Sequence, residues 1–222
     1  MYYLGEEVYI IEKMRSLLQI IMGSMLLSII HASIPNHWMP LVLIGKTEKW
    51  NDTETLSITF IVSSLHVLST VIVGILIGFI GYRLSSTYEF ITSIGAPLIL
   101  IGLGFFYFLM DLKMNHHHVD TQLIISDKSK ITVILSLGTA MFFSPCIEIE
   151  AYYFTASKLG WSGIIAVSLI YFFVTVIGML LFVYLCLKGF KKVRWQFIEK
   201  HEKRVTGVVL IVLGVFVLLT EM

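Results

Sequence analysis

Side chains that bind transition metals occur at three places in a chain that is otherwise largely apolar. Residues 31–37 (His-Ala-Ser-Ile-Pro-Asn-His) carry two imidazoles, His66 stands alone, and residues 144–150 (Ser-Pro-Cys-Ile-Glu-Ile-Glu) carry a thiol and two carboxylates. Together these donors suit borderline divalent ions such as nickel, cobalt, zinc and ferrous iron, whereas magnesium and calcium need only oxygen. The sequence therefore predicts a metal site with the ligands His31, His37, His66, Cys146, Glu148 and Glu150.

Prolines stand inside the first and last of these groups. Proline removes a helical hydrogen bond and clashes with the preceding turn, so we expect a kinked or unwound backbone at Pro35 and Pro145. His31 and His37 are six residues apart, about 120° around an ideal helix, and a break at Pro35 would turn both rings toward one cavity. Pro35, Asn36 and Pro145 are therefore expected to line the substrate pathway.

Some of these residues have a simpler structural interpretation. A single histidine in an apolar helix is often only a hydrogen-bonding partner for a neighbouring helix, so His66 alone would indicate little. Tyr152, Tyr153 and Tyr171 are expected to be packing or interfacial residues, and Cys186 a buried apolar one. Ionisable groups at membrane depth are nevertheless costly, and their accumulation here favours a functional site.

The rest of the sequence has the composition of a membrane protein. Hydrophobic residues make up 57% of the 222 residues and charged ones 14%, against about 25% in soluble domains, which excludes a disordered, nucleic-acid-binding or ordinary globular protein. A bilayer-spanning helix needs about 20 apolar residues. We therefore predict an all-α, polytopic protein, a single integral membrane domain over 1–222, with six transmembrane helices. They correspond to six charge-free runs, the fourth extended to about Ser157: 16–45, 55–82, 90–110, 131–147, 159–187 and 205–220.

Positive charges are distributed unequally between the two ends of these helices. The loops after the first, third and fifth helices carry twelve lysines and arginines, and the opposite side carries four. By the positive-inside rule, the basic loops face the cytoplasm of a plasma membrane and both termini lie outside. The cytoplasmic loop 111–130 contains His116, His117 and His118, which either collect metal for the site or lie in an ordinary solvated loop.

The two halves of the chain resemble each other. Because each half holds three helices, an odd number, the second half must insert upside down relative to the first, as in many secondary transporters. We expect inverted repeats over about 16–110 and 131–221, with proline-broken first and fourth helices meeting near the midplane of the membrane. The matching segments keep a nearly constant offset: 33–36 with 143–146, 70–72 with 175–177, and 100–102 with 212–214.

Residues 31–37 resemble the first-helix signature of the nickel/cobalt transporter (NicO, RcnA-like) and urease-accessory UreH-like membrane proteins, which is a His, four residues, an Asp and a His, usually with a Pro before the Asp. His66 falls where those proteins carry a second-helix histidine. The resemblance implies the LysE-type transporter superfamily and metal translocation, with His31, His37 and His66 as ligands. Asn36 departs from the family, which has Asp there; Glu148 and Glu150 are the candidates to restore the missing charge.

Two other functions compete with metal transport. The Ser144-Pro145-Cys146 stretch is similar to the Pro-Cys motif of the cytochrome-c-biogenesis thiol transporters, which carry electrons across the membrane with one cysteine in each repeat. Here the repeat partner of Cys146 is Asn36 and the other cysteine is Cys186, so thiol-disulfide exchange is poorly supported. A sulfite or organosulfur-anion exporter is disfavoured because the polar core offers acids and histidines instead of fixed cations.

The sequence thus predicts a transporter, with export expected, that moves a divalent transition-metal ion by alternating access and is not an enzyme. The metal is substrate and ligand; no nucleotide motif or organic cofactor is expected, so ion gradients or mass action must drive the transport. Expected partners are the metal ion and the lipid bilayer and no nucleic acid. A homo-oligomer and delivery of metal to a maturing metalloenzyme both stay open.

Overall fold

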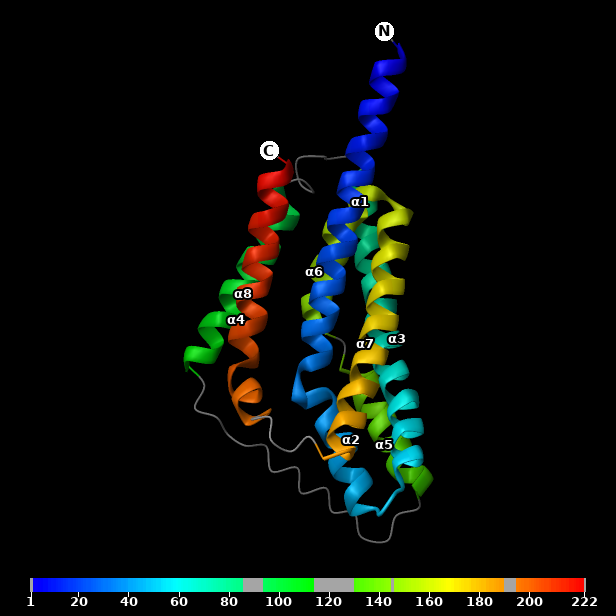
Figure 1. The fold of residues 1–222 in the computed structure, drawn as a ribbon. Coiled ribbons are helices and arrows are strands. Elements are labelled where there is room, and N and C mark those ends of the chain that lie inside the picture. Colours follow the sequence, from blue (N-terminus) through cyan, green and yellow to red (C-terminus); the bar gives the residue numbers. More distant parts are fainter. Residues whose placement is uncertain (1, 86–93, 114–129, 145, 190–194, 222) are drawn as a thin grey trace.

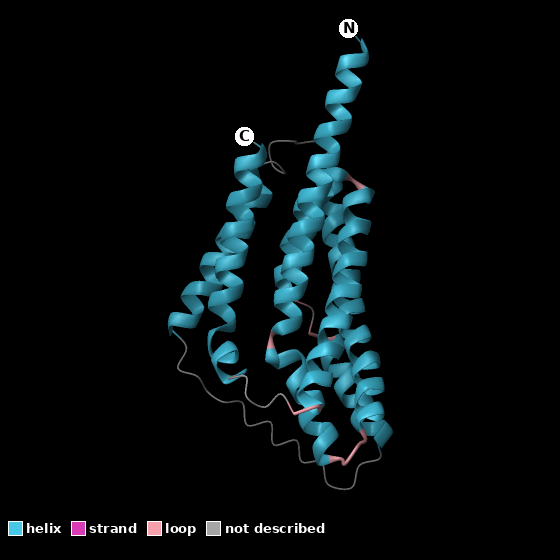
Figure 2. Ribbon diagram, viewed as in Figure 1, coloured by secondary structure: helices cyan, strands magenta, loops and turns pink. Residues whose placement is uncertain are grey.

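The computed structural model describes residues 2–85, 94–113, 130–144, 146–189 and 195–221, and within them the chain is helical and contains no strand (Figures 1 and 2). The predicted all-α class is therefore confirmed for this part of the chain. The elements are α1 (Tyr2–Ser33), α2 (Pro35–Thr47), α3 (Asp52–Ser85), α4 (Ala96–Lys113), α5 (Lys130–Phe142), α6 (Ile147–Ala156), the short 3-10 helix η2 (Ser157–Leu159), α7 (Trp161–Leu187) and α8 (Trp195–Glu221).

The helix expected to break at Pro35 does so one residue earlier, at Ile34. Ile34 has an extended backbone (φ −68°, ψ 119°), and Pro35 opens α2 in its first turn. Proline suits this position because the first N–H groups of a helix have no helical acceptor, while its ring pushes the preceding residue out of the helical region. The result is an interrupted element, α1 followed directly by α2.

A second interruption separates α5 from α6. The end of α5 tightens into a turn in which Ser144 N–H donates to the carbonyl of Met141 (3.3 Å). Cys146 then has an extended backbone (φ −94°, ψ 113°) and caps the start of α6. Pro145, predicted to cause this break, lies outside the described residues. The two interruptions fall in segments that match each other in the two halves of the sequence, 33–36 and 143–146.

Three helical stretches are long and apolar enough to cross a membrane: Ile10–Thr47, which runs from α1 through α2, Asp52–Leu84 and Trp161–Leu187. Shorter apolar helices are Pro97–Leu109, Lys130–Phe142 and Arg204–Leu219. Large apolar side chains such as Leu169, Phe173 and Leu181 are exposed along α7. Such a surface is unremarkable in lipid, whose tails are as apolar as leucine. These features are compatible with localisation in a membrane.

The helices pack in two groups. α4 and α8 lie against each other along their length, beside the bundle of α1, α2, α3, α5, α6 and α7 (Figure 1). In that bundle α1 packs mainly on α7, α5 and α6 pack on α3, and α3 packs on α7. The start of α1 and the end of α8 lie at the same end of the molecule (Figure 1).

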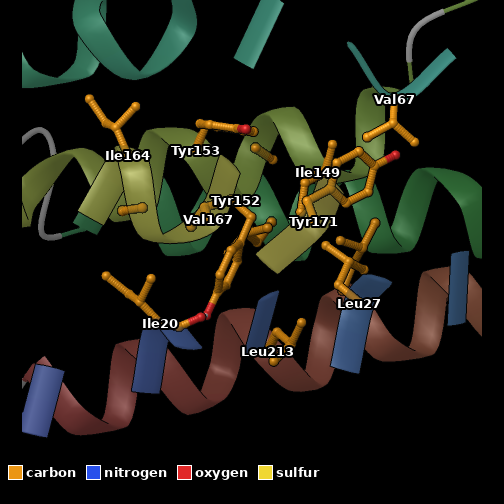
Figure 3. Close-up of a cluster of buried hydrophobic side chains, with 14 of the residues drawn as sticks. Ile20, Leu27, Val67, Ile149, Tyr152, Tyr153, Ile164, Val167, Tyr171 and Leu213 are labelled. Carbon is orange, nitrogen blue, oxygen red and sulfur yellow. The ribbon is translucent and has the colours of Figure 1, made fainter. Parts of the chain in front are cut away.

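Tyrosines of α6 hold its position between α1, α3 and α7. Tyr152 and Tyr153 are fully buried in the main apolar cluster, as expected for packing residues (Figure 3). The Tyr152 ring fits against Gly23 of α1 and the Tyr153 ring against Gly74 of α3, where a Cβ would overlap the rings. The short helix α6 is therefore packed rigidly on one side of its break.

Glycines bring the backbones of α4 and α8 into contact. A Cβ added at Gly104 would lie 2.6 Å from the carbonyl oxygen of Gly207, and one at Gly207 would lie 2.6 Å from the carbonyl oxygen of Gly104. Small residues permit this close approach, which is a principal source of helix association in lipid, where hydrophobic burial gives no preference. The pair is thus closely packed.

We predict that Gly104→Ala lowers the free energy of unfolding by about 1–3 kcal/mol, because the new methyl group meets backbone that cannot move aside. The control is Gly102→Ala, where a Cβ finds nothing within 4 Å. That substitution should be neutral or stabilising by up to about 1 kcal/mol, since alanine favours the helix. Denaturant unfolding in detergent micelles measures both; equal losses would contradict the packing described.

Candidate metal centre

Four of the predicted ligands converge inside the helix bundle. One donor atom from each of His31, His37, His66 and Cys146 lies within 4.8 Å of the others. His31 belongs to the last turn of α1, His37 to the first turn of α2, His66 to the middle of α3, and Cys146 to the start of α6. These four residues, the four-residue cluster, thus come from both helix interruptions and from the intervening helix α3.

The break at Ile34 is what brings the first two histidines together. On a continuous helix, six residues separate two side chains by about 9 Å along the axis and 120° around it. In the structure the ring centroids of His31 and His37 are 4.3 Å apart. The ring of His66 lies 5.8 Å from that of His31 and 5.0 Å from that of His37. The convergence expected from a break near Pro35 is therefore observed.

Cys146 lies at a distance suited to a shared metal ion from two of the histidines. Its Sγ lies 3.4 Å from Nε2 of His31 and 3.4 Å from Nε2 of His66. Around a tetrahedral ion with bonds of about 2.3 Å to sulfur and 2.0–2.1 Å to nitrogen, sulfur and nitrogen are separated by about 3.5 Å. Both distances therefore fit an ion bound between the sulfur and the two rings, with His37 as a further ligand.

A hydrogen bond to the end of α5 sets the orientation of His66. Its Nδ1 lies 3.0 Å from the carbonyl oxygen of Met141. Since a carbonyl can only accept, Nδ1 carries the proton and donates it, and Nε2 presents its lone pair toward Cys146. Metal-binding histidines generally have such a partner on their other nitrogen. The Met141 carbonyl lies in the last turn of α5, which ends at Phe142, and its two lone pairs accept both the Ser144 N–H and the His66 ring N–H.

Thr70 ties the start of α6 to α3. Its hydroxyl donates to the carbonyl of His66 (3.2 Å) and accepts the backbone N–H of Cys146 (3.3 Å). The thiol and His66 are therefore held by one short network. Burial is deep: His66 is fully buried, and His31 and Cys146 are 5% and 8% exposed, while His37 is partly exposed. Water is thus largely excluded from three of the four donors.

The two acidic residues predicted as ligands lie outside the four-residue cluster. Glu148 is half-buried in the first turn of α6. Glu150 is 6% exposed, and neither carboxylate oxygen has a hydrogen-bond partner in the part of the chain that the structure describes. Whether they handle metal stays a prediction. Of the expected pathway residues, Pro35 is buried and Asn36 is exposed, while Pro145 and the loop residues His116, His117 and His118 lie outside the described residues.

Cys186 is remote from this chemistry. Both cysteines are free, and Cys186 is half-buried near the end of α7, packed against a second apolar cluster that includes Trp38 and Met179. The expectation of a packing role agrees with this position, although the side chain is less buried than expected. Cys186 is therefore a suitable control for the chemistry of Cys146.

We expect Co²⁺ or Zn²⁺ to raise the unfolding free energy of the purified protein by about 2.7 kcal/mol at a hundred times Kd. His31→Ala, His37→Ala and Cys146→Ser should each abolish most of this gain, because each removes one of four converging donors. Cys186→Ser should retain it. Thermal unfolding of every variant with and without metal measures the effect, and metal-dependent shifts equal to wild type in the three ligand variants would exclude the site.

Comparison of the chain with protein-family models, with curated proteins and with solved structures finds no match. The similarity of residues 31–37 to the nickel/cobalt transporter and UreH-like proteins therefore rests on those short stretches alone.

Proposed function

We propose that this protein transports a divalent transition-metal ion across a membrane by way of the four-residue cluster. The observation that carries the proposal is the convergence of three imidazoles and one thiol, from both interrupted helices and α3, in the interior of a bundle with three helices apolar enough to span a bilayer. Neutral imidazoles and a thiolate select borderline ions over Mg²⁺ and Ca²⁺. One thiolate also leaves a bound divalent ion with less net charge in a low-dielectric interior.

The same reasoning favours six membrane spans arranged as two inverted repeats. In this arrangement α1 with α2 corresponds to α5 with α6, α3 to α7, and α4 to α8. If a two-fold axis relates the repeats, each contact in one half has a counterpart in the other. The packing of α1 and α2 on α7 then corresponds to the packing of α5 and α6 on α3. The same axis also requires α3 to pair with α7 and α4 with α8, and these are the principal contacts between the helices. Alternating access would follow from motion of one repeat against the other.

Transport itself is tested in sealed proteoliposomes containing a metal-sensitive dye. Wild type should carry Co²⁺ or Zn²⁺ down its gradient well above the rate of protein-free vesicles, and His37→Ala should be at least tenfold slower because a converging ligand is lost. Cys186→Ser is the matched control and should transport like wild type. A protein that binds metal normally but never exceeds empty vesicles would contradict transport and favour delivery of metal to another protein.

Orientation is a separate part of the proposal. The cation distribution favours a cytoplasmic location for the end of α7 at Lys188, which forms an ion pair with Asp52 at the start of α3 (3.5 Å). We expect Ser162→Cys, at the other end of α7, to react with an impermeant thiol reagent in intact cells. Lys188→Cys should react only after permeabilisation. Both substitutions are made in a chain with Cys146 and Cys186 replaced by Ser, and the reverse labelling pattern would invert the proposed topology.

A further inference from the structure

Tyr171 of α7 occupies the place in the second half of the chain that His66 occupies in the first. Residues 70–72 (Thr-Val-Ile) match residues 175–177 (Thr-Val-Ile), and the same offset carries His66 onto Tyr171. His66 contributes directly to the four-residue cluster. The residue at the equivalent position in the other repeat is therefore a candidate for a role at the same site.

The structure places Tyr171 against that cluster. The side chain is fully buried, in the same cluster of side chains as Val67 of α3 and Ile149 of α6 (Figure 3). Its ring centroid lies 5.6 Å from that of His31. Its hydroxyl faces the side chains of Cys146 and Thr70.

Tyr171 differs from the other buried tyrosines in what its hydroxyl bonds. Tyr152 donates to the carbonyls of Gln19 (3.2 Å) and Ile20 (3.3 Å), and Tyr153 donates to the hydroxyl of Ser168 (2.9 Å). Among the described residues, none forms a well-aligned hydrogen bond with the Tyr171 hydroxyl. A buried hydroxyl without a well-aligned partner is unfavourable, and the two side chains that this hydroxyl faces, Cys146 and Thr70, are the candidates to accept its proton.

We propose that Tyr171 is a positioning residue that donates its O–H to the Cys146 sulfur when the thiolate binds metal. The inference rests on the proposed metal site and adds a residue to it. A metal-bound thiolate keeps lone pairs that point away from the ion, and a hydrogen bond to one of them stabilises the buried negative charge. Thr70 cannot supply this bond because its proton already goes to the His66 carbonyl. A metal-bound thiolate accepts a hydrogen bond more strongly than a thiol does, so the contribution of Tyr171 is largest in the metal-bound protein.

The experiment uses Co²⁺, whose thiolate charge-transfer absorption reports the electron density on sulfur, with the full-length protein in detergent. Tyr171→Phe should move this band to lower energy, because a thiolate without the hydrogen bond is a stronger donor, and should weaken Co²⁺ binding about tenfold. Tyr152→Phe and Tyr153→Phe, whose hydroxyls bond elsewhere, should leave the band in place. Metal-free Tyr171→Phe should unfold at or above the wild-type temperature, since it loses an unpaired hydroxyl.

A second variant covers the case in which Tyr171→Phe does not fold. Tyr171→His carries the residue of the equivalent position in the other repeat and restores an N–H donor, so its band should stay near that of wild type. An unshifted band in Tyr171→Phe, or a shifted band in Tyr171→His, overturns the assignment of Tyr171 while leaving the metal site intact. Absence of any thiolate band in the wild type would instead refute the site itself.

Discussion

The two helix interruptions, together with the backbone groups that the second one exposes, are the constraint on which the rest of the site depends. A continuous helix satisfies its own backbone, and inside an apolar bundle few other partners exist. Where α5 stops, the Met141 carbonyl accepts from His66 and thereby fixes which nitrogen of that ring can bind metal. Where α6 begins, the Cys146 N–H is satisfied by Thr70. The two backbone groups at the second break, the Met141 carbonyl and the Cys146 N–H, are thus the ones that orient the side chains of His66 and Cys146.

The choice of donors affects how much it costs to bury the site. Histidines buried in a membrane interior are inexpensive as neutral bases but costly as cations, and a thiol is inexpensive until it ionises. The four-residue cluster therefore costs little to bury in its neutral form, and a divalent ion bound there as proposed would bring the positive charge that a thiolate balances. Glu150, buried with neither carboxylate oxygen bonded to a described residue, lies outside the cluster, and its side chain too is costly to bury in the ionised form.

Much of the fold and part of the site could be predicted from the sequence because both depend on local rules. Charge-free runs predict the all-α class, which the described residues confirm, and Pro35 predicts a break that the structure places one residue earlier, at Ile34. Glu150, predicted as a ligand beside Cys146, lies outside the four-residue cluster, because residue type alone does not decide which neighbours a side chain contacts. The Met141 carbonyl could not be found, since backbone groups carry no signal in residue type. Tyr171 is predicted to be a packing or interfacial residue, although the offset between the matching segments places it opposite His66.

The two halves are most informative where they differ. The segments they share, such as the Thr-Val-Ile sequences at 70–72 and 175–177, belong to the packed helices α3 and α7. The candidate ligands fall on positions at which the aligned halves differ: Cys146 aligns with Asn36, and His66 with Tyr171. Met141, which aligns with His31, contributes its carbonyl where His31 contributes a ring nitrogen. If the two halves are repeats, each supplies equivalent residues around the same metal site. A single ion needs donors from only some of these residues. The remaining positions are then free to orient those donors, which is the role that the Met141 carbonyl already has and that Tyr171 is proposed to have.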